Sequence, residues 1–388
     1  MTNKFDVNGD LVEDVKEAPE EQEQEFYSLD RIKELKCQYN LIFGKRSNGK
    51  TYAVLYEGVK NYVERGKQMA YLRRYREDFV GKRGQVLFNS LVSSGAIKEI
   101  TSGKWDSVKY MSSQWFLAKK DPNKDGKMII DSCPFCYGFS LGQMEHDKST
   151  SYPDVTTIVF DEFISRIGYI PNEFVLFMNV LSTIIRQRDD VKIYMLGNTV
   201  NKYCPYFAEM GLKNVATMQQ GAIDIYQFGD TGAKVAVEYA ETVAVKKPSN
   251  KYFCFDNQNL QMITSGKWEL AAYPHLQTKY RPKDVIFVFY IVFNDNILQG
   301  NVVNDGENDF IFIHPKTTEI KDTENSLIYS LECNSRPNYR RRLLSNITEI
   351  DKKITKYFAM DKVFYQSNEV GELVRNYIKI SSVNNLVS

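Results

Sequence analysis

The chain has 388 residues, and its 50 basic and 49 acidic side chains leave a formal net charge of +1. A hydrophobic content of 43% and a charged content of 26% are ordinary for a globular protein and exclude collagen, a coiled coil and wholesale disorder. The longest apolar runs, at 174–185 and 285–293, are shorter than the roughly 18–20 residues that a membrane helix needs, so we expect no membrane partner. At about 150 residues per domain, the length predicts two or three domains.

Charge is unevenly distributed along the chain. Residues 1–25 hold nine acidic side chains against two lysines and lack apolar periodicity, which predicts a disordered acidic tail. Residues 26–388 then carry 48 basic and 40 acidic side chains, a net charge of +8, and residues 26–110 alone carry 17 and 8. The near-neutral total is therefore no argument against a nucleic-acid partner.

The strongest local pattern follows a short apolar strand predicted at 39–43. Residues 44–51 read GKRSNGKT and fit G-x-x-x-x-G-K-[ST], and apolar residues at helical spacing come next. Such glycines let successive backbone N–H groups point at phosphates, reinforced by the positive end of the helix. We expect Lys50 to reach the β- and γ-phosphates of a nucleotide and the Thr51 hydroxyl to bind Mg²⁺. The predicted nucleotide-binding residues are Gly44, Lys45, Arg46, Ser47, Asn48, Gly49, Lys50 and Thr51.

Cys133 and Cys136 have C-x-x-C spacing. A tetrahedral zinc site needs four ligands, and neither a second such pair nor a nearby pair of histidines accompanies them. We interpret them as two thiols in a strand of an apolar hairpin, in preference to metal or redox chemistry.

A loop of this kind is expected to work with an apolar strand that ends in an acid. Residues 157–162 read TIVFDE and supply that element. We expect Asp161 to hold Mg²⁺ and Glu162 to polarise the water that attacks the γ-phosphate. The pair is typical of proteins that hydrolyse ATP.

A helix is predicted over 171–188, with Pro171 in its first turn. It ends in Arg186 and Arg188. Arginines there either complement the helix dipole or reach the γ-phosphate bound to a neighbouring subunit, and the residues alone favour neither interpretation.

Another strand is predicted at 191–196, followed by Asn198. Additional-strand P-loop ATPases keep a γ-phosphate sensor at such a position, whereas an asparagine in a loop is equally common without any such role. Both interpretations stay open from the residues.

Beyond residue 210 the patterns are weaker. Residues 211–249 resemble a small linker or lid domain, and an α+β domain is expected from about 250. The run Arg340–Arg342 either grips phosphate or forms the exposed face of a helix. The strands predicted in this domain, which two late helices follow, are 252–256, 285–293, 297–303 and 309–313.

Several longer blocks extend these motifs. They are YLRRYRED (71–78), SYPDVTTIVFDEFI (151–164), YIPNE (169–173), IIRQR (184–188), LGNTV (196–200) and PYF (205–207). With them, the sequence resembles the DNA-packaging ATPases, or encapsidation proteins, of phi-29-like tailed phages, which are compact relatives of large terminase subunits. The resemblance covers about 38–210 closely and the rest weakly, and NEVGELVRNYIK (368–379) is the clearest late match.

The resemblance implies roles for individual residues. Arg186 falls on the family's trans-acting arginine finger, Lys148 on a second essential basic position at the subunit interface, and Asn198 on the sensor. The DNA-facing position of the ring pore falls on Arg76, with two arginines beside it, although a solvated basic strand end is the alternative for all three. The implied DNA-binding residues are Arg73, Arg74 and Arg76.

The resemblance also implies a fold. We expect an α/β chain with an additional-strand (ASCE) P-loop ATPase domain at 26–210, a linker or lid at 211–249 and an RNase H-like domain at 250–388. Nucleases of the RNase H type use several carboxylates around two metals. Because the strand at 285–293 has no internal acid, with Asp284 before it and Asp295 after it, we expect a vestigial domain without nuclease activity.

The function that these features imply is an ATP-driven, Mg²⁺-dependent motor that moves double-stranded viral DNA into a procapsid. Its partners would be DNA, further copies in a ring that is pentameric in the family, and the portal; use of a packaging RNA is left open. It would act in the host cytoplasm, transiently on the portal vertex. The alternatives are another nucleic-acid-stimulated P-loop ATPase (a helicase, or a terminase with an active nuclease) and a scaffold that uses ATP only as a structural ligand.

Overall fold

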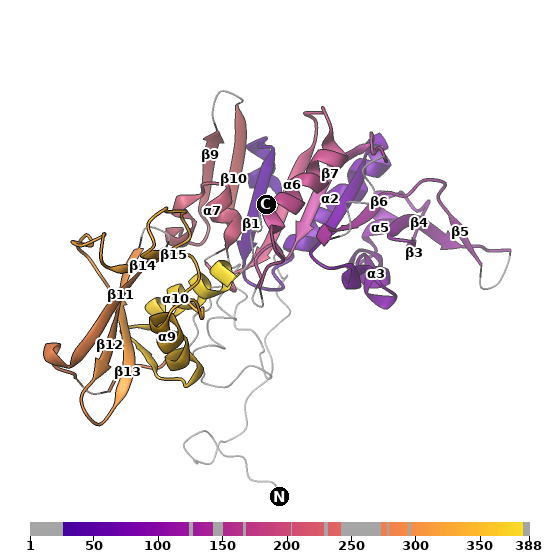
Figure 1. Ribbon diagram of the computed structural model, residues 1–388. Coiled ribbons are helices and arrows are strands. Elements are labelled where there is room, and N and C mark those ends of the chain that lie inside the picture. Colours follow the sequence, from indigo (N-terminus) through magenta and orange to yellow (C-terminus); the bar gives the residue numbers. More distant parts are fainter. Residues whose placement is uncertain are drawn as a thin grey trace, which may run out of the picture.

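The computed structural model describes residues 26–123, 127–142, 150–165, 168–202, 204–228, 232–241, 273–277, 279–293 and 296–382. Within these residues the strands form two sheets, which lie in separate parts of the molecule (Figure 1). The predicted acidic tail, the strand at 252–256, Lys148 and Asp295 all lie outside the described residues. Among the residues described, no helix is long and apolar enough to cross a membrane.

The first sheet holds ten of the described strands in the order β3-β4-β6-β2-β7-β8-β1-β10-β9, with β5 beside β4. The six strands from β6 to β10 in this order are parallel to one another, so their carboxyl ends meet at one edge. The strands are β1 (Tyr39–Gly44), β2 (Gln68–Arg73), β3 (Ser107–Met111), β4 (Gln114–Lys120), β5 (Met128–Ile130), β6 (Cys136–Ser140), β7 (Val155–Asp161), β8 (Lys192–Asn198), β9 (Ile223–Phe228) and β10 (Ala233–Tyr239).

Helices pack on both faces of this sheet because its central strands are apolar on both sides. Leu41 and Phe43 of β1 belong to the core completed by α6 (Glu173–Ile185) and α7 (Pro205–Glu209). The intervening Ile42 belongs to the opposite core, with α2 (Lys50–Arg65). Smaller elements complete this part: α1 (Asp30–Glu34), the 3₁₀ helix η1 (Arg76–Phe79), α3 (Lys82–Val86), α4 (Asn89–Ser93), α5 (Ala96–Ile100) and the 3₁₀ helix η3 (Lys213–Thr217).

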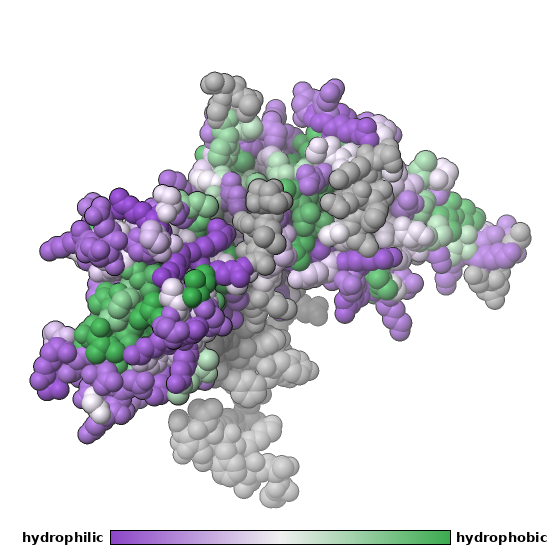
Figure 2. All heavy atoms as spheres, viewed as in Figure 1, coloured by the Kyte–Doolittle hydropathy of each residue, from purple (hydrophilic) through white to green (hydrophobic). Residues whose placement is uncertain are grey.

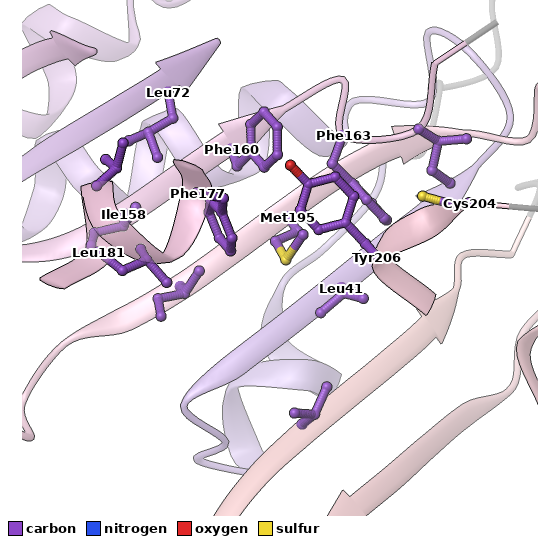
Figure 3. Packing of buried hydrophobic residues seen from close by; sticks show 14 of the residues in the cluster. Leu41, Leu72, Ile158, Phe160, Phe163, Phe177, Leu181, Met195, Cys204 and Tyr206 are labelled. Atoms are coloured by element: carbon purple, nitrogen blue, oxygen red, sulfur yellow. The ribbon is translucent and has the colours of Figure 1, made fainter. Parts of the chain in front are cut away.

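Aromatic side chains dominate the core under α6. The ring of Tyr206 lies among those of Phe160, Phe163 and Phe177, with centroids 5.6, 5.9 and 5.7 Å away (Figure 3). All four side chains are fully buried, and each such burial stabilises the fold by about 1.5–3 kcal/mol. This packing fixes α6 and α7 against the strand that ends in Asp161.

The segment predicted as a linker or lid instead completes the first sheet. β10 pairs in parallel with β1, and β9 returns antiparallel to it. The physical reason is that Val235 and Val237 continue the apolar face of β1, which would otherwise be an exposed sheet edge. The first sheet therefore extends to Tyr239, past the boundary expected at 210.

Two local expectations also need correction. Pro171 lies in the turn before α6, which begins at Glu173 with Asn172 as its N-cap. Of the two thiols expected in one strand, the buried Cys136 begins β6, whereas the exposed Cys133 lies in the preceding loop.

The second sheet, within the described residues, has the order β15-β14-β11-β12-β13-β16. The strands predicted at 285–293, 297–303 and 309–313 are present as β11, β12 and β13. They pair as an antiparallel meander, and β14 runs parallel to β11. α9 and α10 pack on one face (Figure 1), and Figure 2 shows apolar surface over β11 and β12. The elements are the 3₁₀ helix η4 (Pro282–Asp284), β11 (Val285–Phe293), β12 (Asn296–Asn304), β13 (Asp309–Pro315), β14 (Leu327–Ser330), β15 (Tyr339–Arg340), α9 (Glu349–Ala359), β16 (Val363–Tyr365) and α10 (Asn368–Ser382).

The arginine run that begins at Arg340 is not on a helix. Arg340 belongs to β15 and forms an ion pair with the fully buried Asp351 of α9. Arg341 donates a hydrogen bond to the carbonyl oxygen of Leu331 at 3.0 Å. Since a buried carboxylate needs a partner, the pair holds β15 against α9.

Candidate active site

The predicted loop, the acid pair and Asn198 meet at the carboxyl edge of the first sheet. β8 lies between β1 and β7, with Asn198 in register with Gly44 and Leu196 in register with Asp161. The backbone N–H of Thr199 donates to the carbonyl oxygen of Gly44 at 3.3 Å. Groups separated by more than 100 residues in the sequence are therefore neighbours in space.

The loop 44–49 ends at the start of α2. Gly49 is the N-cap, with a φ of 95° in the left-handed region that favours glycine, and a Cβ there would lie 3.3 Å from Phe26. The N–H of Tyr27 donates to the carbonyl oxygen of Asn48 at 3.0 Å, so the segment before α1 packs on the loop. The sequence showed no pattern for this contact. The first N–H groups of α2 form a positive helix end suited to phosphate.

Lys50 is 5% exposed, although its side chain is charged. Its Nζ donates to the carbonyl oxygen of Lys45 at 2.7 Å and to Oδ1 of Asn48 at 3.0 Å. Burial lowers the pKa of Lys50 to about 8, and the nearby Asp161 carboxylate only partly offsets this. Among the residues that the structure describes, the buried Nδ2 of Asn48 has no hydrogen-bond partner. Lys50 and Asn48 thus leave hydrogen-bonding capacity in the loop for a ligand.

Asp161 lies at the centre of the site. Its Oδ1 is 3.5 Å from the hydroxyl of Thr51, and its Oδ2 accepts a hydrogen bond of 2.6 Å from the buried Tyr71 hydroxyl. Burial raises the pKa of Asp161, opposed by the Arg73 guanidinium 3.6 Å away. A hydroxyl and a carboxylate at this spacing are oxygen ligands of the kind that Mg²⁺ prefers, so the residues present fit that ion.

Glu162 follows β7 in an unusual backbone conformation. Its φ is 61°, in a region where residues other than glycine are strained, and its side chain is 57% exposed. Its Oε2 lies 2.9 Å from Nη2 of Arg73, which also contacts Asp78. The Glu162 side chain is therefore exposed at the same sheet edge as Lys50, with its carboxylate paired to Arg73.

The three arginines expected to face DNA have different environments. Arg76 is exposed at the start of η1, and Arg73 is held among acids at the site. The expectation is wrong for Arg74, which is 7% exposed and paired with Glu173. A residue just past the end of a strand can face either way, and the alternation along β2 does not reveal which.

Arg186 lies away from the other predicted site residues. It is the C-cap of α6, with a φ of 54°, and it donates to the carbonyl oxygen of Thr150 at 2.9 Å, before β7 begins. The 13-residue helix starts at Glu173 and is about 20 Å long. Arg186 is exposed at the opposite end of α6 from Glu173.

Arg188 has a different role from Arg186. Its guanidinium donates to the carbonyl oxygens of Tyr152, Pro153, Val155 and Ile184 at 2.7–3.3 Å. These bonds hold the end of α6 against the beginning of β7. Arg188 is thus a local clamp, next to the exposed Arg186.

Comparison with known proteins adds independent information. The family model for "Podovirus DNA encapsidation protein (Gp16)" matches residues 116–359, which include the acid pair and Arg186 but not the loop 44–51. The DNA packaging protein of Bacillus phage B103 is 32% identical over 188 residues, covering 48% of this chain and 50% of that one. That of Bacillus phage phi29 is 29% identical over 187 residues, covering 47% and 48%. The chain thus spans about half the length of the curated relatives it matches.

Solved structures extend the likeness in fold to nearly the whole chain. The Phi-28 gp11 DNA packaging motor matches with a TM-score of 0.52 and 19% identity over 93% of this chain and 99% of that one. The bacteriophage Phi-29 genome packaging motor assembly matches with a TM-score of 0.52 and 21% identity over 91% and 99%. At these identities the matches show a common mixed α/β fold. Since the family model covers more than half of the sequence, the chain belongs to the podovirus DNA encapsidation protein (Gp16) family.

Proposed function

We propose that the protein is an ATP-driven motor that moves double-stranded viral DNA into a procapsid. The observation that carries this proposal is the meeting of Lys50 and Thr51 with Asp161 and Glu162 at one sheet edge, in a member of the encapsidation family. A loop that binds phosphates next to a partly buried and an exposed carboxylate is suited to hydrolysing a nucleoside triphosphate.

Each residue at this sheet edge has a separate role in the proposed hydrolysis of ATP. Lys50 and the first N–H groups of α2 bind the β- and γ-phosphates, and Thr51 and Asp161 would hold Mg²⁺, which neutralises phosphate charge. Glu162 accepts a proton from the attacking water, and Asn198, at the end of the neighbouring β8, contacts the γ-phosphate. Arg186 acts on a neighbouring subunit, because in its own chain it lies at the far end of α6. Lys148, outside the described residues, is proposed to act at the same interface.

Two finer features of fold belong to this proposal. The position of β8 between β1 and β7 supports assignment to the additional-strand class of P-loop ATPases. In the second sheet, a meander β11–β13 is followed by β14 and β15 parallel to β11, an arrangement that supports an RNase H-like domain. We propose that this domain does not cleave DNA, because β11 and β14 carry no acidic residue and Asp284 is paired with Arg281.

The proposed assembly is a ring, with five copies as in the family, docked on the portal of a procapsid in the host cytoplasm. A ring brings Arg186 of one copy to the nucleotide of the next and surrounds the DNA. We propose that Arg76 faces the DNA. Its side chain is exposed, three residues beyond Arg73. Phosphate contacts of this kind are independent of sequence and weaken with salt.

The proposal is tested by measuring phosphate release from ATP with and without double-stranded DNA. Turnover is expected to rise with DNA, and Arg76→Ala is expected to reduce that rise while leaving DNA-free turnover unchanged. The variant should also reduce the slope of log affinity against log salt by about 0.9 for each DNA phosphate that it no longer neutralises. Lys98→Ala removes an exposed cation on α5 and is the matched control. Absence of ATP turnover would contradict the proposed function; equal stimulation of Arg76→Ala would reject only the DNA contact.

The buried Lys50 makes ATP binding sensitive to pH. Because its pKa in the free protein is lowered to about 8, part of the Lys50 population is neutral at pH 8.5, and phosphate should restore the charge. ATP affinity is therefore expected to fall as pH rises through 8, and binding at pH 8.5 should take up protons. The stability of the folded protein changes with pH in the opposite direction. Between the folded pKa of about 8 and the ordinary value of 10.5, Lys50 binds more protons in the unfolded chain, so its contribution to the free energy of unfolding rises with pH over this range.

Calorimetry at pH 8.5 in two buffers of different ionisation enthalpy measures the proton uptake. Lys45→Met removes a neighbouring cation of the same loop and should leave the uptake unchanged. If the wild-type protein takes up no protons at pH 8.5, Lys50 is fully charged before ATP binds, and the prediction is wrong.

A further inference from the structure

A buried ion pair links the strand that precedes η1 to the start of α6. Arg74 is 7% exposed and Glu173 is 4% exposed. Nε of Arg74 donates to Oε2 of Glu173 at 2.7 Å, and Nη2 donates to Oε1 at 2.8 Å. This two-pronged geometry is the strongest that a guanidinium and a carboxylate adopt. A buried ion pair is costly to form, so its position in the fold calls for a physical account.

The remaining donors of Arg74 bind the backbone of the proposed base. Nη1 donates to the carbonyl oxygen of Glu162 at 3.1 Å, and Nη2 also donates to that of Phe163 at 3.0 Å. Glu162 has a φ of 61°, a strained conformation that persists only where surrounding contacts fix it. The two bonds from Arg74 are such contacts, since they hold the carbonyl oxygens of Glu162 and of the next residue, Phe163.

Glu173 is itself fixed on every side. Its Oε1 accepts a hydrogen bond from the Tyr206 hydroxyl at 2.9 Å, and its Oε2 accepts one from the N–H of Ile170 at 2.9 Å. Tyr206 is in turn packed among the aromatic rings under α6 (Figure 3). Burial opposes the charge of Arg74, but its hydrogen bonds with Glu173 hold the pKa of Arg74 above the ordinary value. The guanidinium therefore stays charged and rigid.

We propose that Arg74 and Glu173 are positioning residues for Glu162. Arg74 holds the strained backbone that directs the Glu162 carboxylate to the attacking water, and Glu173 anchors Arg74 to the first turn of α6. This inference rests on the proposed role of Glu162 as the base. It also gives a physical account of why Arg74 is buried, although Arg73 is partly exposed and Arg76 is exposed.

The test uses two substitutions. Arg74→Lys keeps the positive charge but loses the paired hydrogen bonds of the guanidinium, and Glu173→Gln keeps the side-chain shape but loses the negative charge. Both are measured as the full chain with DNA, by ATPγS affinity, by kcat and by thermal unfolding. We expect affinity within twofold of wild type and kcat lowered about 100-fold, the loss typical of a displaced reacting group. Asp351→Asn alters a buried ion pair of the second sheet and controls for general destabilisation; its kcat should stay close to wild type.

A double variant separates positioning from a merely structural role. If Arg74 acts through Glu162, adding Arg74→Lys to Glu162→Gln should lower kcat less than twofold further, because the two losses share one cause. A loss of the same factor in both backgrounds would overturn the proposal, as would weakened ATPγS binding in proportion to kcat, or failure of both single variants to fold. If wild type turns over ATP and Glu162→Gln does not, while Arg74→Lys matches wild type, this inference alone fails. An inactive wild type would instead contradict the proposed function.

Discussion

Replacing Glu162 with glutamine is expected to leave ATP bound and to lower turnover by about a thousandfold, within the range that a general base contributes. Glutamine keeps the size of the side chain but has no carboxylate to accept the proton of the attacking water. Binding should be spared, because the phosphates contact Lys50 and the start of α2 instead. ATPγS affinity by calorimetry and phosphate release under saturating ATP measure the two effects separately.

The matched control is Glu77→Gln, an exposed acid of η1 near the same edge. It should change neither affinity nor turnover, which excludes a general effect of lost negative charge. Hydrolysis by Glu162→Gln at the wild-type rate would mean that another group takes the proton. Loss of ATP affinity together with turnover would mean that Glu162 organises the loop rather than the water.

The parts of the site that could be predicted are those whose chemistry is local in the sequence. The glycines of 44–51 and the acids after 157–160 each follow an apolar strand, and parallel strands bring their carboxyl ends to one edge. The three strands from 285 to 313 were likewise predicted, since each of them is rich in apolar residues. In these places local pattern and final fold agree, as expected for a funnelled sequence.

The parts that could not be predicted depend on partners distant in the sequence. The sequence does not distinguish Arg74 from Arg76. Arg74 is buried because it pairs with the carboxylate of Glu173, which is 99 residues away in the sequence. β10 extends the sheet because β1 offers it an apolar edge, although nearly 200 residues separate the two. The contact of Tyr71 with Asp161 was hidden for the same reason: a tyrosine in an apolar strand looks like any core residue.

Arg186→Ala and Lys50→Ala proteins, each inactive alone, are expected to recover ATPase activity when mixed. An arginine supplied in trans contributes about 10³–10⁵-fold to turnover, so Arg186→Ala alone should have almost no ATPase activity. Lys50→Ala alone should also be almost inactive, because it lacks the lysine that binds the phosphates. In a ring of head-to-tail contacts, an interface that pairs an intact loop with an intact arginine forms with a probability of about one quarter on random mixing. Recovery of up to this fraction of wild-type turnover is the expected result, and coordination between subunits would reduce it.

Arg188→Ala is the control, because Arg188 binds carbonyl oxygens of its own chain at the same helix end. The Arg188→Ala substitution should lower the unfolding temperature. Mixing this variant with Lys50→Ala should not restore the unfolding temperature. Phosphate release from equimolar mixtures, with ring formation checked by sedimentation, measures the outcome. If rings form and the Arg186→Ala mixture shows no recovery, Arg186 acts within its own chain or only structurally. The exposed guanidinium of Arg186, at the far end of a helix about 20 Å long that begins at Glu173, favours recovery.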